Sequence, residues 1–584
     1  MSHRRAIGLI TTFISGRFFE QLMIGVQAVA KQHQVDVLVF HTTPEQVALT
    51  QIAGQSVDGW LVLTYTQGLD LLAEQGKPIV TISCRVPDQP FPAVFPDNRQ
   101  GMKSIMDSLI VKGHRRIAFI GDTTIGDIAE RYQQYHESLR DHDIEADPAL
   151  IVETDNPLAD RGAAAARELL SREVSFTGVV AGNDWTAIGV MRELQMNNRR
   201  VPEDIAVIGF DDIPEVQITN PPLTTVRQHT DELGSTAARL LLDQMAGKRV
   251  EPTMHTVPTT FVPRESSGNS LVERIAQWAK PVLPTGPLLQ TTLSRELVRI
   301  LLPALPIDPP PSAAQVWPEV DRLVQLLVET IEGTTIQALD AHLLNTIFSS
   351  PAILNASSET LAEMLRVLEL AGKVLINGRS DAEGAQQRLY ALLDQLMIEI
   401  MRAYRRRQTT AQRTLSEILQ SQYNISQFML RYPPEQLDWL EETSLFSGCL
   451  GLWSLSGGSQ PATLVVGGAY QREGSSALRI GTSYPVTQFP PLDHLPSSAQ
   501  SNEINIALVM MLRSADHDWG VLVVSGPLIS NDPWLEDNTI NTLEVCCGFL
   551  GLSLERQVLK ESLRDSADNE EILMEQINQM RDDS

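Results

Sequence analysis

A regular alternation of strand-like and helix-like segments over residues 5–265 constrains the fold of this 584-residue chain more than any other feature. Apolar runs alternate with amphipathic stretches such as FFEQLMIGVQAVAKQH; the runs are AIGLITT, VDVLVF, GWLVL, PIVTIS, RIAFIGD, GVVAG and IAVIGF. Buried strands separated by helices form parallel sheets covered on both faces. We therefore predict an α/β domain of two lobes with a cleft between them. Lobe 1 is expected at about 5–110 and 228–250, and lobe 2 at about 111–226 and 256–264.

The remainder of the chain has a different character. A proline-rich linker is expected over 266–320, where residues 303–318 read PALPIDPPPSAAQVWP. Leu- and Ala-rich segments at helical period (VDRLVQLLVETIEG, SETLAEMLRVLELAGKVLI and QQRLYALLDQLMIEIMRAYRRR) predict an all-α region over 321–432. Strand-like runs return between 440 and 555 (CLGLWSL, ATLVVGGAY, SSALRIG, INIALVMML and WGVLVVSG), which favours a small antiparallel α+β module with a C-terminal helix.

The last segment, residues 556–584, has apolar residues on a seven-residue register. They are Leu559, Leu563, Leu573, Ile577 and Met580, while Ser566 and Glu570 occupy the same seam. A short coiled coil and a frayed surface helix are both compatible with this pattern.

The composition of the chain indicates which partners it can bind and in which cellular compartment it is expected. The formal net charge of −26 repels nucleic acid and acidic membranes unless a local basic patch offsets it. The cysteines, Cys84, Cys449, Cys546 and Cys547, form neither a disulfide framework nor a metal-ligand spacing. No apolar run approaches a membrane span, and the short run after Arg4 and Arg5 is broken by Thr11 and Thr12. We expect a cytoplasmic protein with no metal and no cofactor.

Residues 207–228, VIGFDDIPEVQITNPPLTTVRQ, place two carboxylates at the end of a buried strand. Open α/β sheets bind ligands beyond the carboxyl ends of their strands. Asp211 and Asp212 could therefore bind a ligand, act as catalytic acids or cap a helix. Catalysis is disfavoured because adjacent side chains in a strand-end turn should point apart, and because no Ser-His-Asp order, H-E-x-x-H or C-x-x-C motif is present. We expect no enzyme activity.

Several motifs, in order along the first 265 residues, carry a resemblance to a known family. They are VDGWLVL at 57–63, FPDNRQGM at 95–102, KGHRRIAFIGD at 112–122, AGNDWTAIGVMREL at 181–194 and VPEDIAVIGFDDIPEVQITNPPLTTVRQ at 201–228. This part resembles the effector-binding core of LacI/GalR-type repressors, which share the periplasmic-binding-protein fold. The resemblance implies a small-molecule effector bound between the lobes and side-by-side homodimers.

The resemblance also assigns individual residues. Asp211 would hydrogen-bond the effector, whereas Asp212 would stabilise the turn. Arg131 would reach the effector from lobe 2, against the alternative of a surface ion pair. The remaining assignments are Phe18 and Phe19 as a stacking ring or core residues, Asp97 and Asn98 as ligand contacts or a turn, and Asn183 as a contact with Asp184 as a helix cap. The effector class stays open between sugar-like and nucleobase-like.

The later segments also resemble something: a sensor core, a helical spacer and a GAF-like module are the input half of bacterial signalling proteins. Family members begin with a helix-turn-helix, but only Met1 to Arg5 precede AIGLITT, so direct DNA binding is not expected. The leading hypothesis is a ligand-responsive sensor that passes a conformational change to an output domain or partner protein. The alternatives are a LacI-family transcription regulator acting on DNA directly or through a partner, and a scaffold whose cleft binds nothing.

Overall fold

The structure, a computed structural model, describes residues 4–268 with gaps at 15, 64–66, 85–90, 125 and 218, residues 313–333 and 379–433, and part of 435–560. The gaps in that last part are 444, 455–461, 473–477, 495–504, 515–516, 528–542 and 544; a few residues at 294 and between 364 and 376 are also described. Most of the predicted linker, most of SETLAEMLRVLELAGKVLI and the tail beyond residue 560 lie outside the described residues.

The chain divides into two compact units. Unit 1 comprises Met1–Val94, Asp231–Met254 and Thr414–Ser584, and unit 2 comprises Phe95–Thr230 and His255–Arg413. Among the described residues, no helix has both the length and the apolar character needed to cross a membrane.

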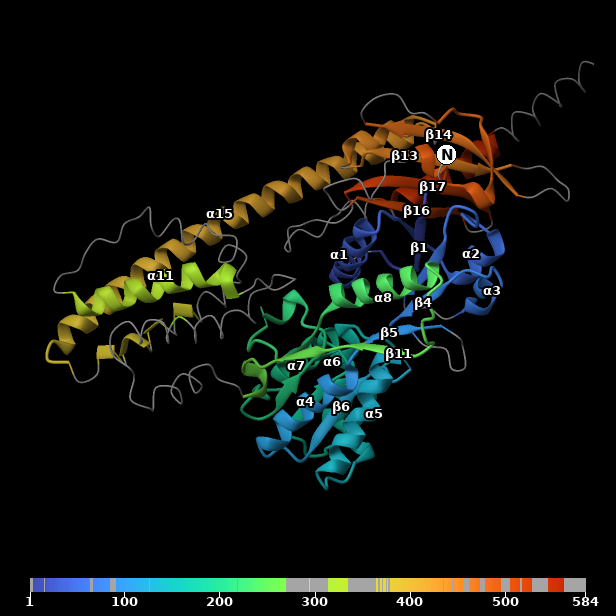
Figure 1. Cartoon of the computed structure of the whole chain (residues 1–584). Helices are drawn as coiled ribbons and strands as arrows, with labels where there is room; N and C mark the ends of the chain where they lie inside the picture. The colour runs from blue at the N-terminus through green and yellow to red at the C-terminus, as the bar shows by residue number, and fades with distance from the viewer. Residues whose placement is uncertain are drawn as a thin grey trace, which may run out of the picture. The chain divides into compact units, whose positions relative to one another are not determined.

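The N-terminal part of unit 1 is built on parallel strands, as their uninterrupted apolar runs predict (Figure 1). The strands are β1 (Ala6–Thr11), β2 (Asp36–His41), β3 (Gly59–Leu63), β4 (Ile79–Ile82) and β5 (Ala93–Pro96). The helices are α1 (Arg17–Gln32), α2 (Pro44–Thr50), α3 (Leu69–Ala73) and α8 (Thr230–Met245). β1 lies between β2 and β3, which leaves β2 on the side of the sheet away from β3 and β4.

The C-terminal part of unit 1 is an antiparallel sheet. Its strands are β13 (Ser447–Trp453), β14 (Thr463–Gln471), β15 (Ser483–Pro485), β16 (Asn505–Arg513) and β17 (Asp518–Pro527). The expected strand SSALRIG is wrong for its described residues, because Leu478 and Arg479 have no regular structure and Ile480 and Gly481 lie in a turn. Gly481 there has φ +85° and donates its N–H to the carbonyl of Val466, which β-branched Ile480 could not do in its place without strain.

The two sheets of unit 1 are continuous, which the sequence did not predict. β16 pairs in parallel with β2, from Ala507 opposite Leu38 to Met510 opposite His41. With β11 (Met254–Val257) beside β5, the combined sheet has 11 strands. Main-chain bonds from Ala53 N to Val486 O (3.1 Å) and from Gln55 N to Thr487 O (2.6 Å) tie the loops beside it.

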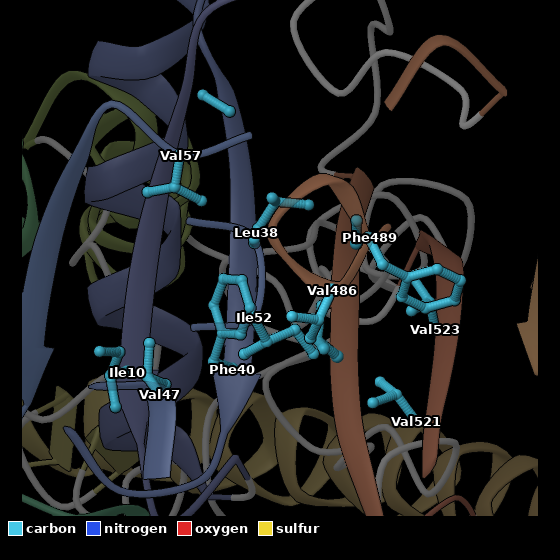
Figure 2. Close-up of a cluster of buried hydrophobic side chains, with 14 of the residues drawn as sticks. Ile10, Leu38, Phe40, Val47, Ile52, Val57, Val486, Phe489, Val521 and Val523 are labelled. Carbon is cyan, nitrogen blue, oxygen red and sulfur yellow. The ribbon is translucent and has the colours of Figure 1, made fainter. Parts of the chain in front are cut away.

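A single hydrophobic core spans this joint. Figure 2 shows Val486 and Phe489 of the C-terminal segment together with Phe40 and Ile52 of the N-terminal segment. Phe489 is fully buried, and its ring lies where a side chain on Gly451 would stand. Pairing by β16 also covers a strand edge that would otherwise be a template for aggregation.

Unit 2 contains a parallel sheet in the order β7-β6-β8-β9, which confirms the parallel α/β pattern predicted for the second lobe. The strands are β6 (Ile117–Gly121), β7 (Ile151–Glu153), β8 (Gly178–Ala181) and β9 (Ala206–Ile208), and β10 (Thr225–Gln228) pairs with β12 (Thr259–Val262) in an antiparallel ribbon. The helices are α4 (Asn98–Val111), α5 (Gly126–Asp141), α6 (Ala159–Ser171) and α7 (Asp184–Met196); β11 (Met254–Val257) enters the unit.

Beyond residue 268 the described helices include α11 (Ala313–Glu332), α15 (Ala382–Arg431) and a helix over residues 545–560. The first two are in contact. Arg388 of α15 joins them by donating to the carbonyls of Thr330 and Ile331 at the end of α11, each at 2.9 Å. Asp381 holds the same guanidinium at 3.0 Å. A positive charge is favourable at the C-terminal end of a helix, where the last carbonyls have no partner within the helix.

Candidate functional site

The candidate site lies where β9 ends, at the turn that carries Asp211 and Asp212. Both residues have positive φ, 120° and 59°, a conformation that non-glycine residues adopt at a cost. The main-chain N–H of Asp211 donates to Val226 O at 2.8 Å, which fixes the turn against β10. As expected for adjacent side chains in such a turn, the two carboxylates contact different partners.

Arg131 on α5 is the cation of the site and is only 2% exposed. Its Nε donates to Asn98 Oδ1 at 2.9 Å, and its Nη1 donates to Gly182 O at 2.7 Å. The same Nη1 lies 3.3 Å from Asp211 Oδ1. The guanidinium also stacks over Phe210, 3.6 Å from the ring centroid, so Nε, Nη1 and one face of the group are all in contact with the protein.

Asp211 is the more accessible partner, with its side chain 27% exposed. Gln228 Nε2 donates to Oδ1 at 2.5 Å, and Arg131 uses the same oxygen. Among the described residues, nothing donates to Oδ2, and the buried Oε1 of Gln228 has no partner either. Burial raises the pKa of Asp211, against the opposing effect of Arg131.

Asn98 joins Arg131 to two more acids. Its Nδ2 donates to Asp127 Oδ1 at 3.2 Å and to Glu130 Oε2 at 3.0 Å. Burial raises the pKa of Asp127 to about 6, with Glu130 adding to the effect and Arg131 and Asn98 opposing it. Around Arg131, the acids Asp127, Glu130 and Asp211 therefore outnumber the one guanidinium that contacts this cluster.

Asp184 is completely buried behind the turn. It accepts from Thr225 Oγ1 at 2.6 Å and from Ile213 N at 3.0 Å. Burial and the neighbouring carboxyl of Asp211 raise the pKa of Asp184 well above its ordinary value. Gly209 makes room for it, because a Cβ at that position would lie 2.1 Å from Asp184 Oδ1.

Asp212 has a structural role at the turn, in keeping with the resemblance. Arg227 and Arg264 each contact one of its oxygens at 2.6 Å. Burial works to raise the pKa of Asp212, but these two guanidinium groups outweigh it and hold the pKa below its ordinary value.

Two of the predicted ligand contacts, Asp97 and Asn183, act as helix caps. Asp97 caps α4 by accepting from Gln100 N at 2.9 Å. Asn183 caps α7 by accepting from Thr186 N at 2.9 Å, and its Nδ2 donates to Pro157 O at 3.0 Å. The cap we expected from Asp184 is thus supplied by Asn183, whose side chain uses both ends within the protein.

The predicted aromatic residues belong to unit 1. Phe19 is 1% exposed and lies in the core, while Phe18 is partly exposed and its ring centroid is 6.4 Å from that of Phe13. Of the two, Phe18 has surface to offer a ligand.

The structure therefore brings together three predicted residues, Asn98, Arg131 and Asp211, and adds Gln228 and Asp127, which sequence reasoning did not select. Gln228 is the last residue of the motif at 201–228 and lies two residues beyond Val226, which bonds the Asp211 turn. Its place in that motif was the signal in the sequence that could have selected it. Among the described residues, no group of three or more His, Cys, Asp or Glu side chains could hold a metal ion.

The raised pKa of Asp127 predicts a pH-dependent stability. A carboxyl whose pKa is higher when folded than the unfolded value near 3.9 keeps its proton in the folded state, so stability falls as pH rises between these values. Asp127→Asn removes this loss and should stabilise the chain by about 1–2 kcal/mol at pH 7 and by nothing at pH 3.5, measured by denaturant unfolding. Asp141→Asn, an exposed position on the same helix, is the control. A stability difference that does not change with pH would contradict the prediction.

Comparison with known proteins relates the N-terminal half of the chain to bacterial transcriptional regulators. Residues 106–267 match the periplasmic binding protein-like domain. The chain is 38% identical over 223 residues to the HTH-type transcriptional regulator CelR of Thermobifida fusca, covering 37% of this chain and 65% of CelR. It is 31% identical over 254 residues to the HTH-type transcriptional repressor CytR of Escherichia coli (strain K12), covering 42% of this chain and 74% of CytR. The HTH-type transcriptional regulator GalS of Salmonella typhimurium is 32% identical over 269 residues, covering 44% of this chain and 78% of GalS.

Residues 106–267 thus carry a periplasmic-binding-protein-like domain. The chain belongs to the LacI/GalR family of transcriptional regulators. The relatives are named as regulators of transcription rather than as enzymes, and they favour our alternative hypothesis of a transcription regulator over a signalling sensor.

Proposed function

We propose that this chain is an effector-responsive regulator of transcription whose effector is a small polar molecule, sugar-like or nucleobase-like. Asp211 would accept hydrogen bonds from the effector through Oδ2, while Arg131 holds Oδ1. The observation that carries the proposal is this division of the carboxylate: one oxygen is occupied by Arg131 and Gln228, and the other has no donor among the described residues. A carboxylate oriented in this way suits paired hydroxyls or a base N–H.

The surrounding residues support recognition of a polar rather than a charged ligand. Three carboxyl groups, those of Asp127, Glu130 and Asp211, surround the one guanidinium of Arg131, so a negatively charged ligand would be repelled. The unpartnered Oε1 of Gln228 offers one more acceptor, which a ligand hydroxyl could satisfy after a small rotation of the amide.

Thermal unfolding of the full chain against a panel of sugars, nucleosides and purines tests the proposal. An effector present at about 100 times its dissociation constant should stabilise the chain by about 2.7 kcal/mol. Failure of every compound in a broad panel would favour the scaffold hypothesis.

Asp211→Ala should weaken binding of any effector found in that panel by about 10–100-fold, because a hydrogen bond to a charged group contributes about 1.5–3 kcal/mol. Isothermal titration calorimetry measures the loss. Asp211→Asn keeps Oδ1 for Gln228 but removes the charge, and Asp141→Ala is the matched control at an exposed carboxylate. Unchanged affinity in Asp211→Ala would rule out this turn as the effector site.

A signalling output through a GAF-like module is the second candidate function. The 50-residue helix α15, which leads to the C-terminal sheet, and the continuity of that sheet with β2 favour it. DNA binding by the full chain separates the two candidates. Sequence-selective binding that weakens steeply between 50 and 200 mM salt, as expected for about 6–10 phosphate contacts, supports direct regulation of transcription. Regulation without DNA binding points to a partner protein.

A further inference from the structure

Residues 545–560 form a helix with two opposite apolar faces. One face packs on the C-terminal sheet through the buried side chains of Cys546, Cys547, Leu550 and Leu554. Cys547 Sγ lies 3.6 Å from Met510 Sδ of β16, which fixes that face against the sheet. The opposite face is therefore a separate apolar surface.

Large apolar side chains stand on that opposite face. The exposed fractions are 58% for Val545, 44% for Phe549, 60% for Leu552 and 58% for Leu559. Their spacings of four, three and seven residues are those of the a and d positions of a heptad, with Phe549 at a and Val545, Leu552 and Leu559 at d. We call these four residues the heptad seam.

We propose that the heptad seam forms a parallel, in-register coiled coil with a second copy of this chain. The same register continues in the sequence beyond the described residues at Leu563, Leu573, Ile577 and Met580, with Ser566 and Glu570 as its polar members. A helix that packed only on a globular core would need one wide apolar face, whereas here a second, narrow a/d stripe lies opposite the buried face.

The charged residues beside the heptad seam favour a second copy of this chain in a parallel orientation. Glu555 is at position g, and Lys560 is at position e of the following heptad. In a parallel, in-register pair, each Glu555 faces Lys560 of the other copy, which is attractive. An antiparallel pair would place g beside g and e beside e, so like charges would meet. Arg556 at an a position is polar, and one such residue favours a defined register over maximal stability.

Light scattering and sedimentation equilibrium of the full chain test the proposal. The combined variant Phe549→Glu and Leu552→Glu should raise the dimer dissociation constant at least 100-fold, with the circular dichroism spectrum unchanged. Val558→Glu is the matched control, because Val558 is 51% exposed on the same helix but lies at position c, outside the seam. Equal loss of the dimer in the two variants would overturn the proposal.

Disulfide cross-linking tests the direction independently of other dimer contacts. Leu559→Cys, at a d position, should form covalent dimers under mild oxidation, whereas Val558→Cys should not. The native cysteines are buried, so the wild-type chain supplies the background. If other surfaces hold the chain together, the glutamate variants keep the dimer mass but Leu559→Cys still cross-links, which supports the seam. A monomeric wild-type chain, or no more cross-linking at 559 than at 558, overturns it.

Discussion

Arg131→Met should lower the free energy of unfolding of unit 2 by about 3–5 kcal/mol, because removing one partner of a buried charge network leaves its acids without compensation. Asp211 and Asn98 would lose their bonds to the guanidinium, and the carbonyl of Gly182 would lose its donor. Methionine keeps the apolar contact with Phe210, so the effect isolates the polar network rather than the packing volume. Chemical denaturation monitored by circular dichroism measures it.

The controls separate charge from geometry. Arg131→Lys retains the charge but cannot reach Asn98, Gly182 and Asp211 together, so an intermediate loss is expected. Arg140→Met, an exposed position at the end of the same helix, should change stability by less than about 0.5 kcal/mol. A loss below about 1 kcal/mol in Arg131→Met would show that water reaches the acids and that the network is not desolvated.

The sequence predicted the parallel strands because each is a short apolar run buried on both faces. It also selected Asn98, Arg131 and Asp211, and these prove to be in contact. It could not select Asp127 or Gln228, because their nearness to Arg131 and Asp211 depends on how α5 faces α4 and on which residue of β10 stands beside the turn. Composition and periodicity do not encode those two alignments.

The position of the helix cap, which we expected at Asp184 and which lies at Asn183, has a similar origin. Either residue can cap a helix, and the choice depends on a one-residue difference in where α7 begins. Once Asn183 takes the cap, the next side chain points into the protein, where Thr225 and Ile213 satisfy it.

The pairing of β16 with β2 was beyond sequence reasoning for another reason. Each strand pattern indicates a buried strand, but the identity of the neighbour is decided by contacts between segments far apart in the chain. The burial of Val486 and Phe489 against the N-terminal strands depends on the same long-range contacts.

Phe489→Ala should destabilise unit 1 by about 3–5 kcal/mol, the usual cost of removing a fully buried phenylalanine. The cavity would open in the core that Val486 and Phe489 share with Phe40 and Ile52. The loss of stability at the joint should therefore speed amide exchange in the N-terminal strands as well as in the C-terminal ones. Hydrogen exchange measures both, and the amides of β2 that lie beside β16 are the ones to follow.

The decisive comparison is between the two segments of the joint. Ile480→Ala, at a side chain 70% exposed in the nearby turn, should leave exchange unchanged and serves as the control. Faster exchange in β2 and β16 together would show that the segments share one cooperative core, because local opening follows contiguous cooperative units. Faster exchange confined to β13–β17 would show instead that the N-terminal sheet is stable by itself and that the pairing with β16 is an addition to it. In that case, β2 would also be open for pairing with another chain whenever the C-terminal sheet detaches.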